Sequence, residues 1–428
     1  MEDLFSVENL KSAAKEIGKS EDYFEFVNDE ENFVNLHNQL ISGSYIPEPL
    51  IKIDLRQKDK TRPIKLSSAK DKIVQRIISK FLTELYDKTF SNKSYAYRPN
   101  KSALKAVNRV SDFINRGYTH VLKTDIKDFF ENIDHEILVK ILKEKIKNEI
   151  LIKYIIFFLK IGSFDTKNNF IEHSAGVDQG SVVSPILSNI YIDLMDKFLE
   201  RHNVDFVRFA DDFVVFAKSK KKAEFVLRNL KRFLKPLKLT LNEEKTYITH
   251  INNGFTFLGV YFRGKYRTLD NERFERIKQK LLSYAKEKNS FENIDRYFTL
   301  ISNYYLQIVK NNTAAKEEIK NLLIDSLVKA VIRQKENLKK IGNKRNFNRY
   351  EIFGCFRIKK QGCGYYFKKG IQSAKKRQIR TERPKKQIRK KSCPFGAYTY
   401  FRIRNEPGRF QKQIRTQKIR KSDKIFSC

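Results

Sequence analysis

Two adjacent carboxylates, Asp211 and Asp212, stand between two apolar runs in the stretch 206–216. The flanking residues favour β-strands, so this stretch predicts a β-hairpin with both aspartates in its tight turn. Taken alone, the pair is more typical of a solvated turn, because Asp is a common turn residue. A third carboxylate changes that interpretation: Asp125 directly follows the run His120–Thr124, which predicts a buried strand.

A carboxylate at the end of a core strand costs desolvation energy unless something compensates for it. A bound divalent cation is the usual compensation, and magnesium prefers carboxylate, water and phosphate oxygens. Asp125 therefore predicts a divalent-cation site, and carboxylate ligands without His suit magnesium. A zinc site in the C-terminal region is disfavoured, since its cysteines lack Cys-x-x-Cys spacing and no His follows His250.

The charge of the chain indicates a polyanionic partner. Its 428 residues include 87 Lys and Arg against 50 Asp and Glu, a formal net charge of +37. Nucleic acid is the first candidate for so basic a protein, and a membrane surface is the alternative. The most apolar stretch, 150–164, is interrupted by two lysines and predicts no membrane span. With no signal-peptide pattern and no cysteine before Cys355, we expect a cytoplasmic protein.

The elements that must position the carboxylates can be followed along the chain. Residues 1–50 predict packed helices that end near Gly43. Residues 51–76 predict a strand pair so rich in Arg and Lys that it could hold a triphosphate, although a solvated basic loop is the simpler explanation. Further helices are expected within 68–116, 136–171 and 271–340, after the loop 176–185, and over 222–237.

The C-terminal region, 341–428, is a separate compositional zone. It carries 27 Lys and Arg and 4 Asp and Glu, which is most of the net charge, and aromatic residues are interleaved with them. Such a composition suits single-stranded nucleic acid, where bases stack and phosphates pair, or a disordered basic tail. Arg380, Arg389 and Arg415, from three Gln-Ile-Arg repeats, are candidate nucleic-acid contacts.

Seven short motifs in a fixed order resemble those of bacterial reverse transcriptases of the group II intron-like branch, which include stand-alone, defence-associated enzymes. They are Arg62-Pro63, Ser94-Tyr95-Ala96-Tyr97-Arg98-Pro99, Asp125-Ile126-Lys127-Asp128-Phe129-Phe130, Gln179-Gly180 with Ser184-Pro185, Phe209-Ala210-Asp211-Asp212, Asn242-Glu243-Glu244-Lys245 and Phe257-Leu258-Gly259. The resemblance covers roughly residues 25–310. Phe209 departs from it, since the family mostly has Tyr there. The C-terminal region does not resemble the endonuclease domain of intron-encoded proteins, which needs His and paired Cys.

The resemblance implies an α+β right-hand polymerase, with fingers, a palm built on an antiparallel sheet, and a helical thumb. It implies these boundaries: 1–50 an N-terminal helical extension, 51–118 fingers, 119–265 palm with a fingers segment at about 136–175, 266–340 thumb, and 341–428 a basic region that binds RNA or DNA.

The resemblance also implies the roles of individual residues. Asp125, Asp211 and Asp212 would hold two magnesium ions, for which manganese could substitute. Arg62 with Lys58 would clamp the triphosphate, Gln179 and Gly180 would line the nucleotide pocket, and Lys245 would protonate pyrophosphate. Phe130 would lie beneath the incoming sugar and exclude a 2′-hydroxyl. Phe257, Leu258 and Gly259 would grip the primer, and Arg98 would contact nucleic acid.

Three functions remain open at this point. The first is RNA-templated DNA synthesis on a dedicated noncoding RNA, with an anti-phage role implied by the resemblance alone. The second is a maturase of a mobile intron, and the third is a non-catalytic RNA scaffold. The partners expected for the first are an RNA template, a DNA primer or cDNA product and deoxynucleotides, without a membrane and with oligomerisation left open.

Overall fold

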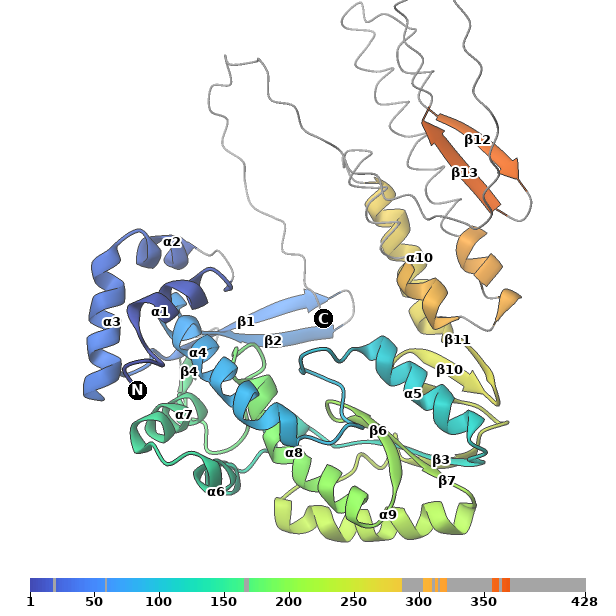
Figure 1. Ribbon diagram of the computed structural model, residues 1–428, viewed down its shortest axis with the longest axis horizontal. Helices are drawn as coiled ribbons and strands as arrows, with labels where there is room; N and C mark the ends of the chain where they lie inside the picture. Colours follow the sequence, from blue (N-terminus) through green and yellow to red (C-terminus); the bar gives the residue numbers. More distant parts are fainter. Residues whose placement is uncertain are drawn as a thin grey trace, which may run out of the picture. The chain divides into compact units, whose positions relative to one another are not determined.

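The structure is a computed structural model of the chain (Figure 1). It describes residues 1–17, 21–57, 60–164, 169–286, 303–309, 312–314, 316–321, 356–361 and 364–369. The chain divides into two compact units, Met1–Asn346 and Phe347–Cys428. In the second unit the described residues form one antiparallel hairpin, β12 (Phe356–Gln361) with β13 (Gly364–Lys369). Among the described helices, each is too short or too polar to cross a bilayer.

Three short helices form the N-terminal segment: α1 (Val7–Ala14), α2 (Glu21–Val27) and α3 (Glu30–Ser42). Ser6 and Asp29 cap α1 and α3 through side-chain oxygens that accept backbone N–H groups. Gly43 ends α3 in the left-handed region, at φ 76°, which glycine adopts without steric cost. Helices α1 and α2 pack against α4 (Ala69–Tyr86) and α3 packs against α1 and α2, so the predicted helical start of the chain is confirmed.

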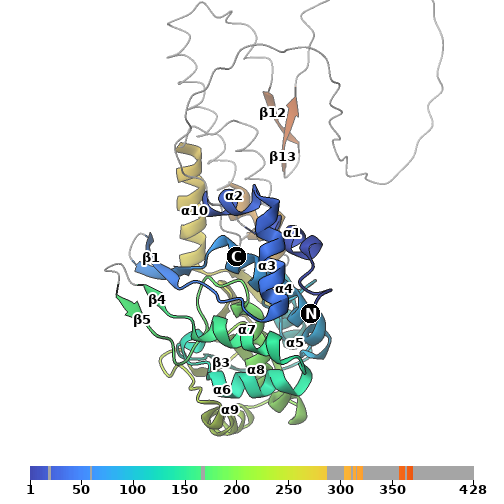
Figure 2. The same ribbon diagram turned by 90° about the vertical axis from the view of Figure 1, so that its left-hand side faces the viewer.

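A four-stranded sheet with the order β2-β1-β4-β5 follows the helices (Figure 2). The hairpin of β1 (Leu50–Gln57) and β2 (Lys60–Leu66) confirms the basic strand pair. The prediction of helix throughout 136–171 was wrong at its end. Helices α6 (His135–Lys145) and α7 (Glu149–Lys160) are followed by β4 (Ser163–Phe164) and β5 (Phe170–Ile171). Strand β4 satisfies its backbone by pairing in parallel with β1, a distant segment that periodicity cannot reveal.

The carboxylates lie on a second four-stranded sheet, here called the central sheet. It consists of β3 (His120–Asp125), β6 (Asp205–Phe209), β7 (Asp212–Ala217) and β8 (Tyr247–His250), in the antiparallel order β6-β7-β3-β8. Alternate residues face opposite sides. Leu122 and Val215 belong to the core that includes α8 (Ser184–Arg201) and α9 (Lys220–Leu234). Val121 and Val214 belong to the core with α5 (Ala103–Asn115) on the other side.

The turn between β6 and β7 differs from the prediction by one residue. Phe209 pairs with Asp212, so the two turn residues are Ala210 and Asp211, and Asp212 is the first residue of β7. Ala210 has φ 57°, while Asp211 keeps an ordinary negative φ. A positive φ at the first turn residue alone is the pattern of a type II′ turn, in which glycine is preferred. The hairpin therefore holds Ala210 in a strained conformation directly before the first aspartate.

A three-stranded sheet with the order β11-β10-β9 leads to the last long helix described, α10 (Asn271–Lys286). Its strands are β9 (Phe255–Phe257), β10 (Val260–Arg263) and β11 (Tyr266–Leu269). The helical prediction for 271–340 is confirmed over α10. Most of the remainder of that range lies outside the described residues.

Candidate active site

The three aspartates predicted from the sequence meet at one end of the central sheet. Asp125 is the last residue of β3 and pairs across the ladder with Asp212, the first residue of β7. Asp211 precedes Asp212 in the turn. Strand alternation places Asp125, Asp212 and Lys123 on the side of the sheet that also carries Val121 and Val214. Two strands that are far apart in the sequence thus bring the carboxylates together.

Burial and mutual repulsion disfavour the ionised carboxylates of this cluster. Burial raises the pKa of Asp211, and the nearby charge of Asp125 raises it further. Burial also raises the pKa of Asp212, although the Lys123 ammonium opposes the shift. Asp125 is only 8% exposed, and its Oδ1 atom is buried without a hydrogen-bond partner among the described residues. A buried, unsatisfied carboxylate oxygen beside two others is a fit for a divalent cation.

Two lysine ammonium groups form ion pairs with the carboxylates of the cluster. Lys245 Nζ lies 2.7 Å from Asp125 Oδ2, and its side chain is 64% exposed. The hydrogen bond to Asp125 raises the pKa of Lys245. Lys123 forms an ion pair with Asp212. Within the described ranges, no three His, Cys, Asp or Glu side chains form a preformed metal cage; Asp125 and Asp212 are each turned toward a lysine.

Sequence reasoning missed Lys123. The signal was present, since Lys123 precedes Asp125 by two residues in a strand and must share its face. Its ammonium also lies 6.0 Å from the ring centroid of Phe257, one of the predicted primer-grip residues. Lys123 therefore links Asp212 to the segment expected to hold the primer.

The predicted nucleotide-pocket residues lie on segments that contact one another. The Lys65 backbone N–H donates to the Gln179 carbonyl at 3.3 Å, which joins β2 to the loop with Gln179 and Gly180. The Lys65 side chain donates to Asp178 Oδ1 at 2.7 Å and strengthens that joint. Arg62 lies on β2, but its side chain is outside the described part, and Lys58 lies outside it entirely.

Phe130 lies against the same loop. Its carbonyl accepts the Val177 backbone N–H at 2.7 Å. A Cβ added at Gly176 would come within 2.9 Å of the carbonyl oxygens of Phe130 and Glu131. Only glycine permits so close an approach, and Gly176 also has φ 86°. The structure thus brings Phe130 and the loop of Gln179 and Gly180 into direct contact.

The predicted primer grip forms a tight turn after β9. Phe257 is fully buried, whereas Leu258 and Gly259 have φ angles of 51° and 67°. The Leu258 carbonyl accepts a hydrogen bond from the Arg273 guanidinium of α10. A Cβ at Gly259 would lie 2.5 Å from the Arg273 side chain. The turn therefore depends on glycine and is fixed to the helix that follows.

Comparison with known proteins agrees with this geometry. The family described as "Reverse transcriptase (RNA-dependent DNA polymerase)" matches residues 51–262, which include both strands that carry the aspartates. Protein YkfC of Escherichia coli is 30% identical over 264 residues, which cover 52% of this chain and 69% of YkfC. The chain belongs to the reverse transcriptase family.

Other relatives place this reverse transcriptase in the group II intron-like branch. Group II intron-encoded protein LtrA of Lactococcus lactis is 27% identical over 328 residues, which cover 60% of this chain and 54% of LtrA. Among solved structures, telomerase from Candida tropicalis aligns with a TM-score of 0.46 at 15% identity, over 75% of this chain and 60% of telomerase. The right-hand polymerase fold and RNA-directed DNA polymerase activity expected from the sequence are those of the family.

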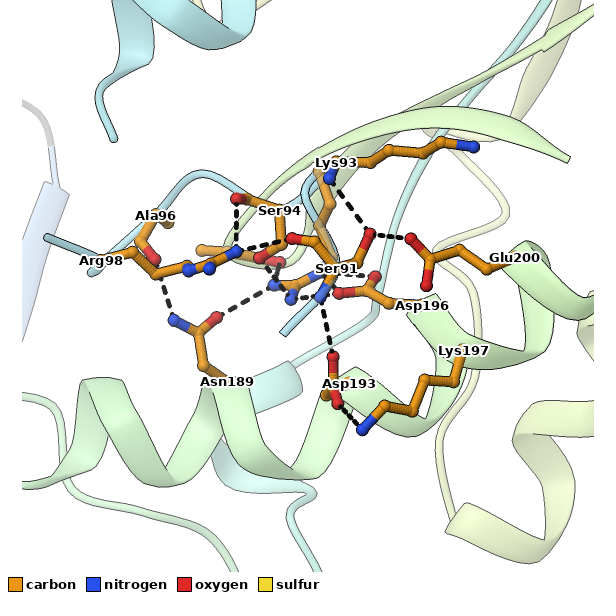
Figure 3. Close-up of polar contacts among 12 residues, drawn as sticks. Ser91, Lys93, Ser94, Ala96, Arg98, Asn189, Asp193, Asp196, Lys197 and Glu200 are labelled. Carbon is orange, nitrogen blue, oxygen red and sulfur yellow. Dashed lines mark hydrogen bonds and ion pairs between the residues drawn. The ribbon is translucent and has the colours of Figure 1, made fainter. Parts of the chain in front are cut away.

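The expectation that Arg98 contacts nucleic acid in this reverse transcriptase is wrong. Its side chain is 4% exposed, and its Nε donates to Asp87 Oδ1 at 2.7 Å. The other guanidinium nitrogens donate to the carbonyls of Asp87, Ser91 and Ser94. Arg98 fixes the connector between α4 and α5 from within (Figure 3). The other predicted contacts, Arg380, Arg389 and Arg415, lie outside the described residues.

A second buried arginine, also missed by sequence reasoning, supports the aspartate hairpin. Arg208 and Asp196 are both fully buried, and Arg208 Nη2 lies 2.6 Å from Asp196 Oδ2. Burial raises the pKa of Asp196 to about 6 even though the Arg208 charge lowers it. Arg208 also donates to Ser94 Oγ at 2.7 Å and to Asn189 Oδ1 at 3.1 Å.

Arg208 reaches the active site through the backbone. Its Nη1 donates to the carbonyl of Ala210 at 3.0 Å, which lies immediately before Asp211. The connector, α8 and the hairpin are therefore tied to one guanidinium that has donors directed at each of them. Such an arrangement can hold the strained turn, and with it the position of Asp211.

Proposed function

We propose that this protein copies RNA into DNA with two magnesium ions held by Asp125 and Asp211, with Asp212 completing the site. The observation that carries the proposal is the pairing of Asp125 with Asp212 beside Asp211, where a buried carboxylate oxygen has no hydrogen bond from the described part of the chain. When bound, the ions would activate the primer 3′-hydroxyl and stabilise the leaving pyrophosphate. Manganese could substitute, because it accepts the same oxygen ligands.

The chain's own residues supply orientation and charge in this proposal. Lys123 neutralises Asp212, and Lys245 is exposed beside Asp125, where it could turn toward a phosphate. The loop of Gln179 and Gly180 supports the nucleotide pocket through its contact with β2. The turn Phe257–Gly259 would hold the primer strand against the same face.

The proposal is tested by primer extension with purified protein, magnesium and a DNA primer annealed to RNA. RNA-templated extension that stops when a chelator removes the metal is the expected result. Activity that persists in the chelator would contradict the metal site. Failure to extend any annealed primer would contradict the polymerase function and favour an RNA scaffold.

We further propose that a dedicated noncoding RNA is the template, in a cytoplasmic role in anti-phage defence. The strongly basic composition supports an RNA partner, and the defence role rests on resemblance to stand-alone enzymes. The alternative is a mobile-intron protein, which the similarity to the intron-encoded LtrA favours. Sequencing RNA and cDNA that copurify with the protein separates them: a short structured RNA supports the first and intron RNA the second.

Phe130 is expected to exclude ribonucleotides by steric contact with their 2′-hydroxyl. Phe130→Ala should therefore reduce discrimination against ribonucleotides by roughly 10- to 200-fold, the range expected from a single lost steric contact. The measurement is the ratio of kcat/KM for a deoxynucleotide and its ribonucleotide. The neighbouring Phe129 is a core residue, 2% exposed, so Phe129→Leu serves as the control and should leave the ratio unchanged. Unchanged selection in Phe130→Ala would remove Phe130 from the pocket.

A further inference from the structure

The outer face of α9 is a basic surface that the catalytic reaction does not use. The segment 218–238 contains nine Lys and Arg and one acidic residue, Glu224. All nine cations are exposed. They are Lys218, Lys220, Lys221, Lys222, Arg228, Lys231, Arg232, Lys235 and Lys238. Three of them pair with acidic residues: Lys220 with Glu224, Lys231 with Glu243 and Lys238 with Asp134. Within the described part of the chain, the other six have no recorded ion pair.

Part of this surface is arranged as a line along the helix. Lys221, Phe225, Arg228 and Arg232 follow one another at steps of four, three and four residues, which is the spacing of one helical face. Lys235 continues the line in the 3-10 turn after α9, so the line is about 20 Å long. We call these five residues the α9 stripe.

An aromatic ring stands within the line of cations. Phe225 is 49% exposed, although α9 buries its other large apolar side chains or packs them against the core. The Lys222 ammonium lies 5.2 Å from the ring centroid. An exposed ring flanked by cations is the combination that binds single-stranded nucleic acid, because a base stacks on the ring while adjacent phosphates pair with the cations.

The α9 stripe lies on the side of the central sheet away from the aspartates. Ala223, Val226 and Leu230 of α9 share a core with Leu122 and Val215 of the sheet. Asp125 and Asp212 lie on the other face, with Val121 and Val214, which belong to the core that contains α5 and β9. Figure 1 shows α9 and α5 on opposite sides of the sheet. A duplex held at the aspartates therefore cannot be the ligand of the stripe.

We propose that the α9 stripe binds a single-stranded segment of RNA outside the active site, with one base stacked on Phe225. The inference rests on the proposed RNA partner and assigns it a second contact surface. A membrane is the less suitable partner, because the apolar face of α9 is buried in the protein core and only a cationic face with one ring is exposed.

The test uses the full chain with a primer–template duplex already bound, so that the active site is occupied. Binding of a fluorescein-labelled oligouridine is measured by anisotropy over a range of salt concentrations. In the quadruple variant Lys221→Gln/Arg228→Gln/Arg232→Gln/Lys235→Gln, the slope of log K against log salt should become shallower by about 3. Phe225→Ala should weaken oligouridine binding about tenfold and leave binding of duplex RNA unchanged.

A matched control removes four exposed cations from α6, α7 and the short connection between them: Lys140→Gln/Lys143→Gln/Lys147→Gln/Lys160→Gln. This variant should keep the wild-type slope. Equal losses in both quadruple variants, or no effect of Phe225→Ala, would overturn the proposal. The proposal would also be overturned if the α9 quadruple variant lost binding to phosphatidylglycerol vesicles but still bound oligouridine like the wild type.

Two readouts keep the result independent of folding and of the polymerase function. Oligouridine containing 4-thiouridine should crosslink to the α9 peptide of the wild-type protein, and crosslinks confined to other segments would overturn the proposal. Extension of a preformed primer–template duplex should be unchanged in every α9 variant. If the wild-type protein crosslinks at α9 but extends no primer, the proposed polymerase function fails while the α9 surface stands.

Discussion

Replacing Asp211 and Asp212 together with alanine is expected to abolish DNA synthesis and leave RNA binding largely intact. The two carboxylates lie beside Asp125, whose Oδ1 accepts no hydrogen bond from any residue that the structure describes. Without them the site would keep one of its three acidic ligands. Loss of several kcal/mol of charge stabilisation in the transition state corresponds to a rate decrease of about a thousandfold or more.

Single-turnover primer extension measures the loss of DNA synthesis, and fluorescence anisotropy measures whether RNA binding is retained. The double variant Glu30→Ala/Glu31→Ala is a suitable control, because it also removes two adjacent acidic residues, both exposed, from α3. It should extend primers at the wild-type rate. If Asp211→Ala/Asp212→Ala extended primers at a rate close to that of the wild type, the proposed metal site would be contradicted.

Asp211, which is expected to be essential for activity, is also expected to lower the stability of the folded protein. Burial and Asp125 raise the pKa of Asp211 above its ordinary value, so the ionised form destabilises the folded state at neutral pH. This destabilisation is complete above the raised pKa, declines as the pH falls from there toward the ordinary pKa of Asp, and is absent below it. The neutral variant Asp211→Asn should therefore unfold at a higher temperature than the wild type in metal-free buffer, while being inactive. Higher stability together with lost activity is the result expected when a functional residue destabilises the folded state.

Replacing Arg208 with methionine is expected to destabilise the fold by about 3–5 kcal/mol, because Asp196 would remain buried as an unpaired charge. The carbonyl of Ala210 would also lose its donor. The second substitution, Asp196→Leu, should restore most of the stability, since apolar replacements of a buried ion pair are often tolerated. Chemical denaturation gives the free energy of unfolding for each variant.

Activity in the restored double variant separates a positioning role from a structural one. If Arg208 positions Asp211 through the Ala210 carbonyl, Arg208→Met/Asp196→Leu should fold but show kcat reduced about 10- to 100-fold with little change in KM. Full activity would show that the ion pair serves stability alone. The half-exposed pair Arg76–Glu16 provides a comparison, and breaking it should cost no more than about 1 kcal/mol.

Local patterns were sufficient to predict the aspartates and the elements that carry them. The strand before Asp125 and the two strands around Asp211 and Asp212 have the composition and length of buried strands, and their pairing is confirmed. The tight turn was misplaced by one residue, because a left-handed alanine at position 210 is not a turn signal. The carbonyl of Ala210 accepts a hydrogen bond from Arg208, which the sequence presents only as a charge within an apolar run.

Contacts between distant segments explain the remaining errors. Arg98 is a plausible phosphate ligand in the sequence, but its partners are the carbonyls of a connector whose path is unknown until the chain folds. The side-chain partners of Arg208 come from two distant segments: Ser94 in the connector, and Asn189 and Asp196 on α8. Periodicity gives the face on which a residue lies, but it cannot give the partner that satisfies a buried charge.

The strand order of the central sheet has a consequence for the growing polypeptide. Strand β3 ends at Asp125 but lies between β7 and β8, which end at Ala217 and His250. During translation β3 leaves the ribosome long before β7 and β8 are synthesised. Until then, the backbone N–H and C=O groups on both of its edges have no strand to pair with. Such a nascent edge invites wrong pairing, so we expect this protein to depend on chaperones during translation and to gain its catalytic end only after His250 has been released.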